Sequence, residues 1–464
     1  MNIRELAVRS LLLIWQDGGY SNIVVSRMIK KYALSDRDRR FYTELVYGTL
    51  RYMAMLDRAI GMLSKRSLQQ MDAVCAAILR LGLYQLQYLD KVPPSAACYE
   101  AVALARKMGH EGMAKFVNAV LRNALRRPEV FVVPSRQEDE VLHLALTYHQ
   151  QNWFIRRCLQ QYGFEETVKL CRFFDTIPEL CVRIQTQKIS REKAMAMLAE
   201  KGIVTRPGRY APESLYIETN DAVQNLELLA AGRAMIQDEA SQLVAHVLDP
   251  QPGDVVLDVC AAPGGKTTHI ASLGGPDCLV YGADIYEHKL QLIRENAKKL
   301  QLSNIRTILQ DAVRIGERFP AKADRVLVDA PCSGLGILRR KLDLRWRKKE
   351  QDLMRLPSLQ TRILNGAAAC VKTGGILVYS TCTINTAENA AVVEAFLQRH
   401  TEFTLLRAGE TCSWPQPGKY IDVLPQRDGI DGFFIAKMRR DSCDAFVVGF
   451  YLAGITAIFR GAQY

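Results

Sequence analysis

The sequence contains no Cys-x-x-Cys pair and no apolar run long enough to span a membrane. Its twelve cysteines are scattered over 464 residues, without a close cysteine–histidine cluster at zinc-ligand spacing, so we expect no metal centre. The longest apolar stretches fall short of the roughly 18 to 20 residues that cross a bilayer. Residues 1–15 carry three charges and lack a small-residue cleavage site. We therefore expect a cytoplasmic protein with reduced thiols and no membrane partner.

Two common nucleotide-binding fingerprints are also missing. The chain has neither the dinucleotide pattern G-x-G-x-x-G nor a Walker P-loop, which disfavours a nicotinamide-dependent oxidoreductase. What is present is an ordinary globular composition, 48% hydrophobic and 24% charged, in a chain long enough for about three domains. The net charge of +12 favours a polyanionic partner such as nucleic acid.

The first third of the chain is predicted to be a basic helical bundle. From Asn2 to about Arg127, apolar residues recur every three or four positions, and no proline occurs before Pro93. Residues 1–140 contain 21 Lys and Arg against 14 Asp and Glu. Two small arginine clusters are candidates either for phosphate contacts or for a solvated helix face: Arg37, Arg39 and Arg40, and Arg122, Arg126 and Arg127.

The sequence then changes to mixed and finally to alternating α/β patterns. Short strands at Leu180–Ile184 and Leu215–Ile217, with a helix over Arg191–Glu200, predict a small α+β module. Beyond Met235, strands alternate with helices and predict a doubly wound sheet with ligands at the carboxyl ends of its strands. The predicted strands are Val255–Asp258, Leu279–Asp284, Ile305–Leu309, Arg325–Asp329 and Ile376–Ser380.

The stretch Val255–Ile270, VVLDVCAAPGGKTTHI, is the centre of this last region. An apolar strand ends in a Gly-Pro-rich loop, and a helix begins at Lys266, which is the order of elements in nucleotide-type cofactor sites. Gly264 and Gly265 allow a ligand to approach the backbone closely, and the helix start offers unpaired N–H groups. The same pattern also occurs in tight strand-to-helix turns that bind nothing.

Carboxylates follow three of the predicted strands. Asp284, at the end of the strand after the loop, has the position of a ribose-binding acid. Asp311 is placed to accept a hydrogen bond from an adenine amine. Asp258 is placed to order the loop near the end of the cofactor that is far from the adenine. Each one alone is as well explained as a helix or loop cap, whereas the three together favour a cofactor site.

Two cysteines lie in polar turns at strand ends. Cys332 lies in DAPCSGLG, shortly after Asp329, and Cys382 lies in YSTCTINTAEN. Positions near helix N-termini lower the pKa of a thiol and expose it, as a nucleophile requires. A cysteine chosen at random is more often a small buried hydrophobe, but these turns make that interpretation weaker here.

Several motifs together resemble known families. The run VPPSAACYEAVALARKMGHEGMAKFVNAVLRNALRR resembles the NusB-like fold, an all-helical RNA-binding domain. The ordered set QDEASQLVAHVL, LDVCAAPGGKTTHI, ADI, QDA, DAPCSGLG, YSTCTINTAEN and DGFFIAKM resembles the RNA cytosine-5 methyltransferases, in particular those acting on small-subunit ribosomal RNA. The resemblance implies four regions: a NusB-like bundle (1–130), an α+β module (131–235), a Rossmann-like methyltransferase domain (236–440) and an atypical apolar extension (441–464).

The resemblance also implies roles for individual residues. Cys382 is the expected nucleophile toward carbon 6 of the cytosine, Asp329 the partner of ring nitrogen 3, and Cys332 the group that removes the carbon 5 proton. The residues alone do not choose between the two thiols. S-adenosylmethionine is the expected cofactor, in contact with Asp258, Cys260, Ala261, Ala262, Pro263, Gly264, Gly265, Lys266, Asp284, Asp311 and Asp329.

The expected substrate is small-subunit ribosomal RNA, bound by a monomer. A basic stretch around Trp346 suits an extruded base and its flanking strand: Arg339, Arg340, Lys341, Arg345, Arg347, Lys348 and Lys349. Two alternatives stay open, namely a transfer RNA methyltransferase and a non-catalytic RNA-binding antitermination or assembly factor. The apolar run Ala445–Phe459 is too short for a transmembrane helix.

Overall fold

A computed structural model describes residues 2–218, 227–412, 414–416 and 418–442. The chain divides into two compact units, each described separately. The helical unit combines residues 1–177 with the distant segment 338–350. The other unit contains residues 178–337 and the chain from residue 351 onward, and we call it the catalytic unit after the role that the sequence predicts for it. The predicted apolar run Ala445–Phe459 lies outside the described residues.

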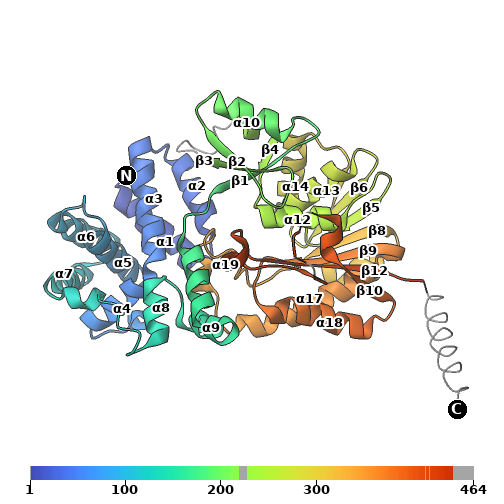
Figure 1. Cartoon of the computed structure of the whole chain (residues 1–464). Helices are drawn as coiled ribbons and strands as arrows, with labels where there is room; N and C mark the ends of the chain where they lie inside the picture. Colours follow the sequence, from blue (N-terminus) through green and yellow to red (C-terminus); the bar gives the residue numbers. More distant parts are fainter. Residues whose placement is uncertain (1, 219–226, 413, 417, 443–464) are drawn as a thin grey trace, which may run out of the picture. The chain divides into compact units, whose positions relative to one another are not determined.

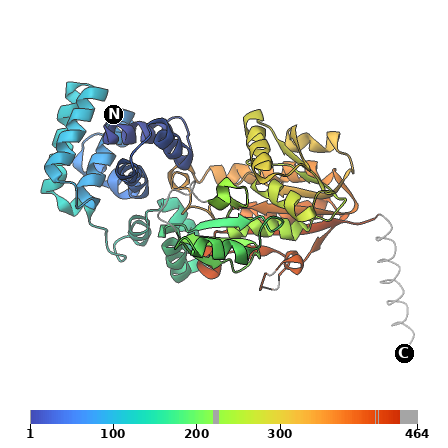
Figure 2. The same ribbon diagram turned by 90° about the horizontal axis from the view of Figure 1, so that it is seen from above.

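The helical unit is a bundle, as its periodicity predicts. Its helices, drawn from blue to cyan-green in Figure 2, are α1 (Ile3–Trp15), α2 (Ser21–Lys31), α3 (Asp36–Arg51), α4 (Met53–Leu63), α5 (Ala73–Tyr88), α6 (Pro94–Met108), α7 (Glu111–Arg126), α8 (Glu140–Thr147) and α9 (Asn152–Asp175). Polar caps fix several starts: the Asp72 carboxylate accepts from the backbone N–H of Val74 at 2.8 Å at the start of α5. The apolar faces of α1, α3, α5 and α7 form one continuous core.

Segment 338–350 completes this bundle although it follows the Pro-Cys motif in sequence. Leu342 lies in the helical core, and the buried Asp343 accepts hydrogen bonds from Ser21. Trp346, in the short helix α16 (Leu344–Arg347), donates its indole N–H to the Leu50 carbonyl at 2.6 Å. The chain therefore leaves the catalytic unit after residue 337, contributes to the core of the helical unit and returns at residue 351.

The catalytic unit begins with a four-stranded antiparallel sheet of order β2-β3-β1-β4. Its elements are β1 (Leu180–Ile184), α10 (Arg191–Ala199), β2 (Val204–Pro207), β3 (Ser214–Glu218), α11 (Glu227–Ala230) and β4 (Ala234–Ile236). The predicted strands at β1 and β3 and the predicted helix at α10 are confirmed. The side chains of the edge strand β2 are mostly exposed, so its sequence needs no apolar alternation. The sequence therefore did not predict this strand.

The second sheet of this unit has the order β10-β12-β9-β8-β5-β6-β7, with β11 paired to β12. Strands β5 to β9 are parallel, and β12 is antiparallel to β9. The strands are β5 (Val255–Asp258), β6 (Leu279–Asp284), β7 (Ile305–Leu309), β8 (Ala323–Asp329), β9 (Val371–Thr381), β10 (Phe403–Leu406), β11 (Ile421–Val423) and β12 (Phe433–Arg440). All five predicted parallel strands are confirmed.

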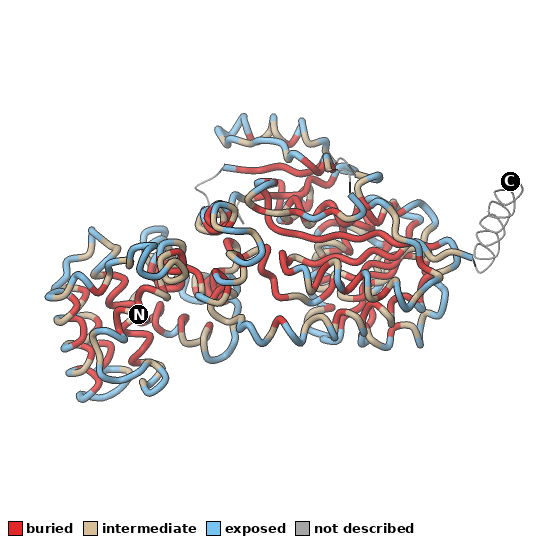
Figure 3. The backbone as a smooth tube through the Cα atoms, turned by 60° about the horizontal axis from the view of Figure 1, so that its bottom comes forward, coloured by how far each residue is buried: buried red, intermediate tan, exposed pale blue. Residues whose placement is uncertain are grey.

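Helices cover both faces of the large sheet, so its central strands are buried on both sides (Figures 1 and 3). On one side lie α12 (Glu239–Leu248), α13 (Gly265–Gly274) and α14 (Glu287–Leu300), and on the other α17 (Asp352–Ala368) and α18 (Ala390–Arg399). The short helices α15 (Ile315–Arg318) and α19 (Pro425–Asp428) join strands. Within the described residues, no helix combines the length and the apolarity that crossing a membrane requires.

Candidate active site

The glycine loop after β5 has the geometry expected of a cofactor loop. Gly264 has φ +100°, and a Cβ atom there would lie 3.1 Å from the Cα of Ile293 on α14. Its N–H donates to the Ala261 carbonyl at 2.8 Å, and the Ala261 N–H donates to Ala283 of β6 at 2.9 Å. Only glycine fits at position 264, and the turn directs the N-terminus of α13 toward the carboxyl edge of the sheet.

Asp258 ends β5 directly under this loop. One carboxylate oxygen accepts a hydrogen bond from the Thr267 hydroxyl at 2.7 Å, and the other is buried without a hydrogen-bond partner among the described residues. Burial raises the pKa of Asp258 to about 7. A buried acceptor without a donor beside a glycine loop suits a ligand that brings its own N–H group.

Asp284 and Asp311 follow the next two strands, as predicted, but each also has a local structural role. Asp284 accepts a hydrogen bond from the backbone N–H of Tyr286 at 3.1 Å and lies 3.9 Å from the Lys289 ammonium. Asp311 accepts from the backbone N–H of Val313 at 2.9 Å and caps a short 3₁₀ turn. Both carboxylates lie on the cofactor side of the sheet, since the carboxyl ends of parallel strands share one edge.

Lys266 and Asp329 form an ion pair at the same edge. The Lys266 ammonium lies 2.9 Å from Asp329, whose second oxygen accepts from the Ser380 hydroxyl at 2.9 Å. Although burial disfavours its charge, the adjacent Asp329 carboxylate raises the pKa of Lys266 above its ordinary value. The pair therefore places a fixed positive charge between the glycine loop and the end of β8.

The two thiols selected from the sequence meet at this point. The sulfur atoms of Cys332 and Cys382 are 3.3 Å apart, and both side chains are partly buried. The hydrogen bond to Cys382, together with burial, raises the pKa of Cys332 well above its usual range. The prediction that its turn lowers the pKa of Cys332 is therefore wrong, because the loop position matters less than the neighbouring thiol. We therefore expect Cys332 to hold its proton in the free enzyme.

Glu388 holds the two cysteine loops together and was not selected from the sequence. Its fully buried carboxylate accepts from the Ser333 backbone N–H at 2.8 Å, from Asn385 at 2.9 Å and from Gln360 at 3.0 Å. These donors come from the Pro-Cys loop, the Thr-Cys loop and α17. A carboxylate within the motif YSTCTINTAEN was the only available signal, and the sequence does not show what it contacts.

Arg183 connects the small sheet with the glycine loop. Its guanidinium is fully buried on β1, donates to the Gly265 carbonyl at 2.7 Å and to the Thr268 hydroxyl at 3.1 Å, and also contacts Gln237. Burial lowers the pKa of Arg183 to about 9. The hydrogen bonds to the first turn of α13 fix the start of the helix from the opposite side of the loop.

The basic stretch predicted to bind an extruded base has, in part, a structural role. Arg345 is buried and donates to the carbonyls of Phe174 and His149, and Trp346 is bound to Leu50. For these two residues the prediction of RNA contact is wrong, because their polar groups are used inside the helical unit. For the other six basic residues of the stretch, RNA contact stays a prediction.

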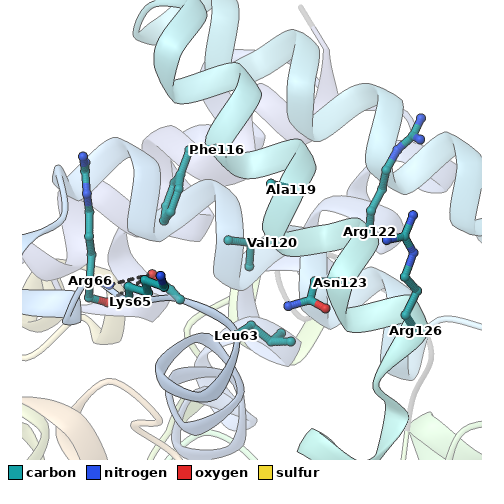
Figure 4. A pocket seen from close by; sticks show the side chains of 10 residues that line it. Leu63, Lys65, Arg66, Phe116, Ala119, Val120, Arg122, Asn123 and Arg126 are labelled. Carbon is teal, nitrogen blue, oxygen red and sulfur yellow. Dashed lines mark hydrogen bonds between the residues drawn. The ribbon is translucent and has the colours of Figure 1, made fainter.

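The helical unit also carries an open basic pocket of about 530 Å³. Figure 4 shows Arg66 and Phe116 on one side and Arg122 and Arg126 on the other, with Asn123 between them. Arg122 and Arg126 also line an adjacent pocket next to α6. This surface includes two residues of one predicted arginine cluster, whereas Arg127 forms an ion pair with Glu129.

Family comparisons match nearly the whole chain in three consecutive parts. Residues 1–126 match the NusB family, residues 150–224 match the ferredoxin-like domain of RsmF/B-like methyltransferases, and residues 245–439 match the 16S rRNA methyltransferase RsmB/F family. A probable ribosomal RNA small subunit methyltransferase B of Bacillus subtilis (strain 168) is 39% identical over 448 residues, which are 95% of this chain and 99% of the relative. The chain belongs to the small subunit methyltransferase B family.

Two further comparisons agree with this family assignment. The ribosomal RNA small subunit methyltransferase B of Yersinia pestis bv. Antiqua (strain Angola) is 33% identical, with 94% of this chain and 98% of the relative covered. The crystal structure titled PH0851 superposes with a TM-score of 0.82 at 25% identity and covers 95% of this chain and 99% of its own. As a member of this family, the chain is an RNA methyltransferase, and the predicted fold class is confirmed: a NusB-like bundle, a ferredoxin-like module and a Rossmann-like domain.

Proposed function

We propose that this protein transfers a methyl group from S-adenosylmethionine to carbon 5 of a cytosine in small-subunit ribosomal RNA, through a covalent adduct with Cys382. The observation that carries the proposal is the 3.3 Å contact between Cys332 and Cys382 beside the ion pair of Lys266 and Asp329. Addition to a pyrimidine ring and later elimination need a nucleophile and a separate proton acceptor within reach of one base.

The residues at the carboxyl edge fit the cofactor. The unpaired oxygen of Asp258 suits a donor such as an ammonium group, and Gly264 lets the loop pack against Ile293 of α14 at the start of α13. We propose that Asp284 binds the ribose diol and Asp311 the adenine amine. Cys260, Ala261, Ala262, Pro263 and Gly265 complete the proposed loop contacts, and when bound the cofactor supplies an electrophilic methyl group.

Cys382 is the better candidate for the nucleophile. Because the hydrogen bond to Cys382 and burial raise the pKa of Cys332 and keep the proton on that sulfur, we propose Cys382 as the sulfur that reacts as a thiolate. The charge of Lys266 lies close enough to Cys382 for the two groups to interact electrostatically. Thiolate attack forms a bond between the sulfur and carbon 6. A proton taken up from solvent with the base is shared between nitrogen 3 and the Asp329 carboxylate, which stabilises the electron-rich ring, and this proton returns to solvent on elimination.

Formation of the bond between Cys382 and carbon 6 lowers the pKa of Cys332. Once Cys382 is covalently bound to carbon 6, it no longer accepts the hydrogen bond that contributes most to the raised pKa of Cys332. Cys332 can then lose its proton to solvent and accept the carbon 5 proton after methylation. The bond between carbon 6 and sulfur breaks, the ring double bond returns, and Cys382 leaves as a thiolate, so one proton is released per methyl group transferred.

The helical unit is proposed to bind the ribosomal RNA. Its open pocket is lined by the side chains of Lys65, Arg66, Arg122 and Arg126 and by the ring of Phe116, and such a combination suits phosphates and an unstacked base. We keep the predicted regions 1–130, 131–235 and 236–440 as a functional division, although segment 338–350 belongs to the helical unit in space.

The deciding experiment measures transfer of a labelled methyl group to small-subunit ribosomal RNA, transfer RNA and an unrelated messenger-like RNA. We expect label on a ribosomal cytosine, no label with Cys382→Ala, and a trapped protein–RNA adduct with Cys332→Ala. Cys278→Ala is the matched control, because this buried cysteine lies outside the site. Swapped phenotypes would assign the nucleophile to Cys332. Label on transfer RNA alone would overturn the substrate, and RNA binding without any label would favour a non-catalytic factor.

A further inference from the structure

Three potential metal ligands meet inside the catalytic unit, away from the two cysteines. Glu213 precedes β3 in the ferredoxin-like module, His246 lies on α12, and His269 lies on α13, the helix that begins at the cofactor loop. The Nε2 atom of His246 is 2.9 and 3.0 Å from the two carboxylate oxygens, and that of His269 is 2.6 Å from Oε1. One ligand atom from each residue lies within 4.8 Å of the others.

The cluster is buried, and its carboxylate faces imidazole rings. The side chains of Glu213 and His269 are 4% and 2% exposed, and that of His246 is 17% exposed. Neither ring nitrogen of His269 makes a hydrogen bond of acceptable geometry in the described chain, although Nε2 points at Glu213. A buried carboxylate is costly without a cation, and an unpaired imidazole nitrogen is costly without a donor or a metal.

Besides His246, the Arg183 guanidinium on β1 also interacts electrostatically with both Glu213 and His269. Its hydrogen bonds go to Gly265, Thr268 and Gln237 rather than to the Glu213 carboxylate. The polar neighbours of the Glu213 carboxylate in this cluster are therefore the two imidazole rings.

We propose that Glu213, His246 and His269 bind a divalent transition-metal ion, with Zn²⁺ as the best match. Two imidazole nitrogens and one carboxylate oxygen suit Zn²⁺, whereas Mg²⁺ and Ca²⁺ prefer oxygen ligands. Tetrahedral coordination with bonds of about 2.0–2.1 Å separates ligand atoms by roughly 3.3 Å, so small side-chain shifts would admit the ion. The partly exposed side of His246 leaves access for a water molecule as fourth ligand.

The ligands are 33 and 23 residues apart in sequence, which is why cysteine and histidine spacing did not reveal them. The ion would connect the ferredoxin-like module, α12 and the helix that follows the cofactor loop. Its role is structural: it fixes α13 from the side opposite to Asp258. The charge of Arg183 opposes a cation, so we expect zinc binding in the micromolar rather than the picomolar range.

The test uses the full-length protein, stripped with a chelator and dialysed against micromolar Zn²⁺. We expect about one zinc per chain for the wild type by elemental analysis, together with an upward shift of the melting temperature. His246→Ala should lower zinc affinity at least tenfold. His400→Ala is the matched control, because His400 also contacts a glutamate, Glu402, but lacks a second histidine. It should bind zinc as the wild type does.

Zinc bound by Cys332 and Cys382 would be a competing explanation for zinc in the wild type, so a separate variant tests it. A variant carrying Cys332→Ser and Cys382→Ser should retain the zinc if the histidine site holds it, and loss of zinc in that variant would overturn the proposal. Cobalt substitution of the wild type gives a readout that needs no variant: absorption bands without a sulfur-to-cobalt charge-transfer transition support the proposed ligands. A stoichiometry near zero in the wild type would show a metal-free hydrogen-bonded cluster instead.

Discussion

The contact between the two cysteine sulfurs sets the pKa of one of them, Cys332. Removing Cys382 should lower the pKa of Cys332, because it removes the hydrogen bond that contributes most to raising that pKa. In Cys382→Ala we therefore expect alkylation of Cys332 by iodoacetamide to begin at lower pH than in the wild type. Mass spectrometry of the modified peptide across a pH series measures the shift. An unchanged profile would mean that burial alone sets this pKa.

A second residue-scale prediction concerns Asp258. Its pKa rises from 3.8 to about 7 on folding, so between these values the folded state holds a proton that the unfolded state has lost. Stability should therefore fall by about 1.4 kcal/mol per pH unit over this window and become independent of this group above it. Asp258→Asn removes the titration. Urea unfolding at pH 5, 6, 7 and 8 should show the variant gaining stability relative to the wild type up to pH 7. Parallel pH curves for the two proteins would contradict this.

In the turn between β5 and α13, position 264 requires glycine because its φ is positive and a Cβ atom would contact Ile293. Gly264→Ala should cost about 1–2 kcal/mol from its left-handed backbone alone. It should also weaken S-adenosylmethionine binding by roughly tenfold or more, since displacing Ile293 moves the start of α13. Calorimetric titration measures the affinity.

Gly253→Ala is the matched control for this loop. Gly253 also has a positive φ, +86°, but a Cβ atom there would meet no other atom within 4 Å. We expect a similar loss of stability without a change in cofactor affinity. An equal loss of S-adenosylmethionine affinity in both variants would mean that Gly264→Ala acts by general destabilisation.

Strands and loops differ in how far the sequence predicts them. The parallel strands were predicted because burial on both faces requires continuous apolar runs, and the cofactor loop because its glycines lie between an apolar strand and a helix start, with carboxylates at the ends of the following strands. The sequence did not show which distant residues would meet. Tertiary contacts decide the roles of Glu388, which joins the two cysteine loops, of Arg183 beside the glycine loop, and of Arg345 inside the helical unit. The two thiols were placed correctly, but the pKa of Cys332 depends on a partner 50 residues away.

At the scale of the whole molecule, segment 338–350 should contribute to the stability of the helical unit and not to cofactor binding. Leu342→Ala removes a side chain that is 6% exposed from the helical core, at an expected cost of about 2–3 kcal/mol. Met354→Ala, at a position 84% exposed on α17, is the nearby control. Thermal unfolding should show a lower transition for Leu342→Ala only. An altered S-adenosylmethionine affinity in this variant would contradict the assignment.

The same segment affects how this protein can be taken apart. A conventional two-domain enzyme is joined by one linker, so that either half can be lost, exchanged or expressed alone. Here the backbone passes between the units three times, near residues 177, 337 and 350. Deleting the NusB-like region would leave Leu342 and Trp346 without their partners, on a loop that begins next to the Pro-Cys motif. The helical unit thus cannot be removed without exposing this segment, and natural or engineered exchange of the unit should succeed only when residues 338–350 are exchanged with it.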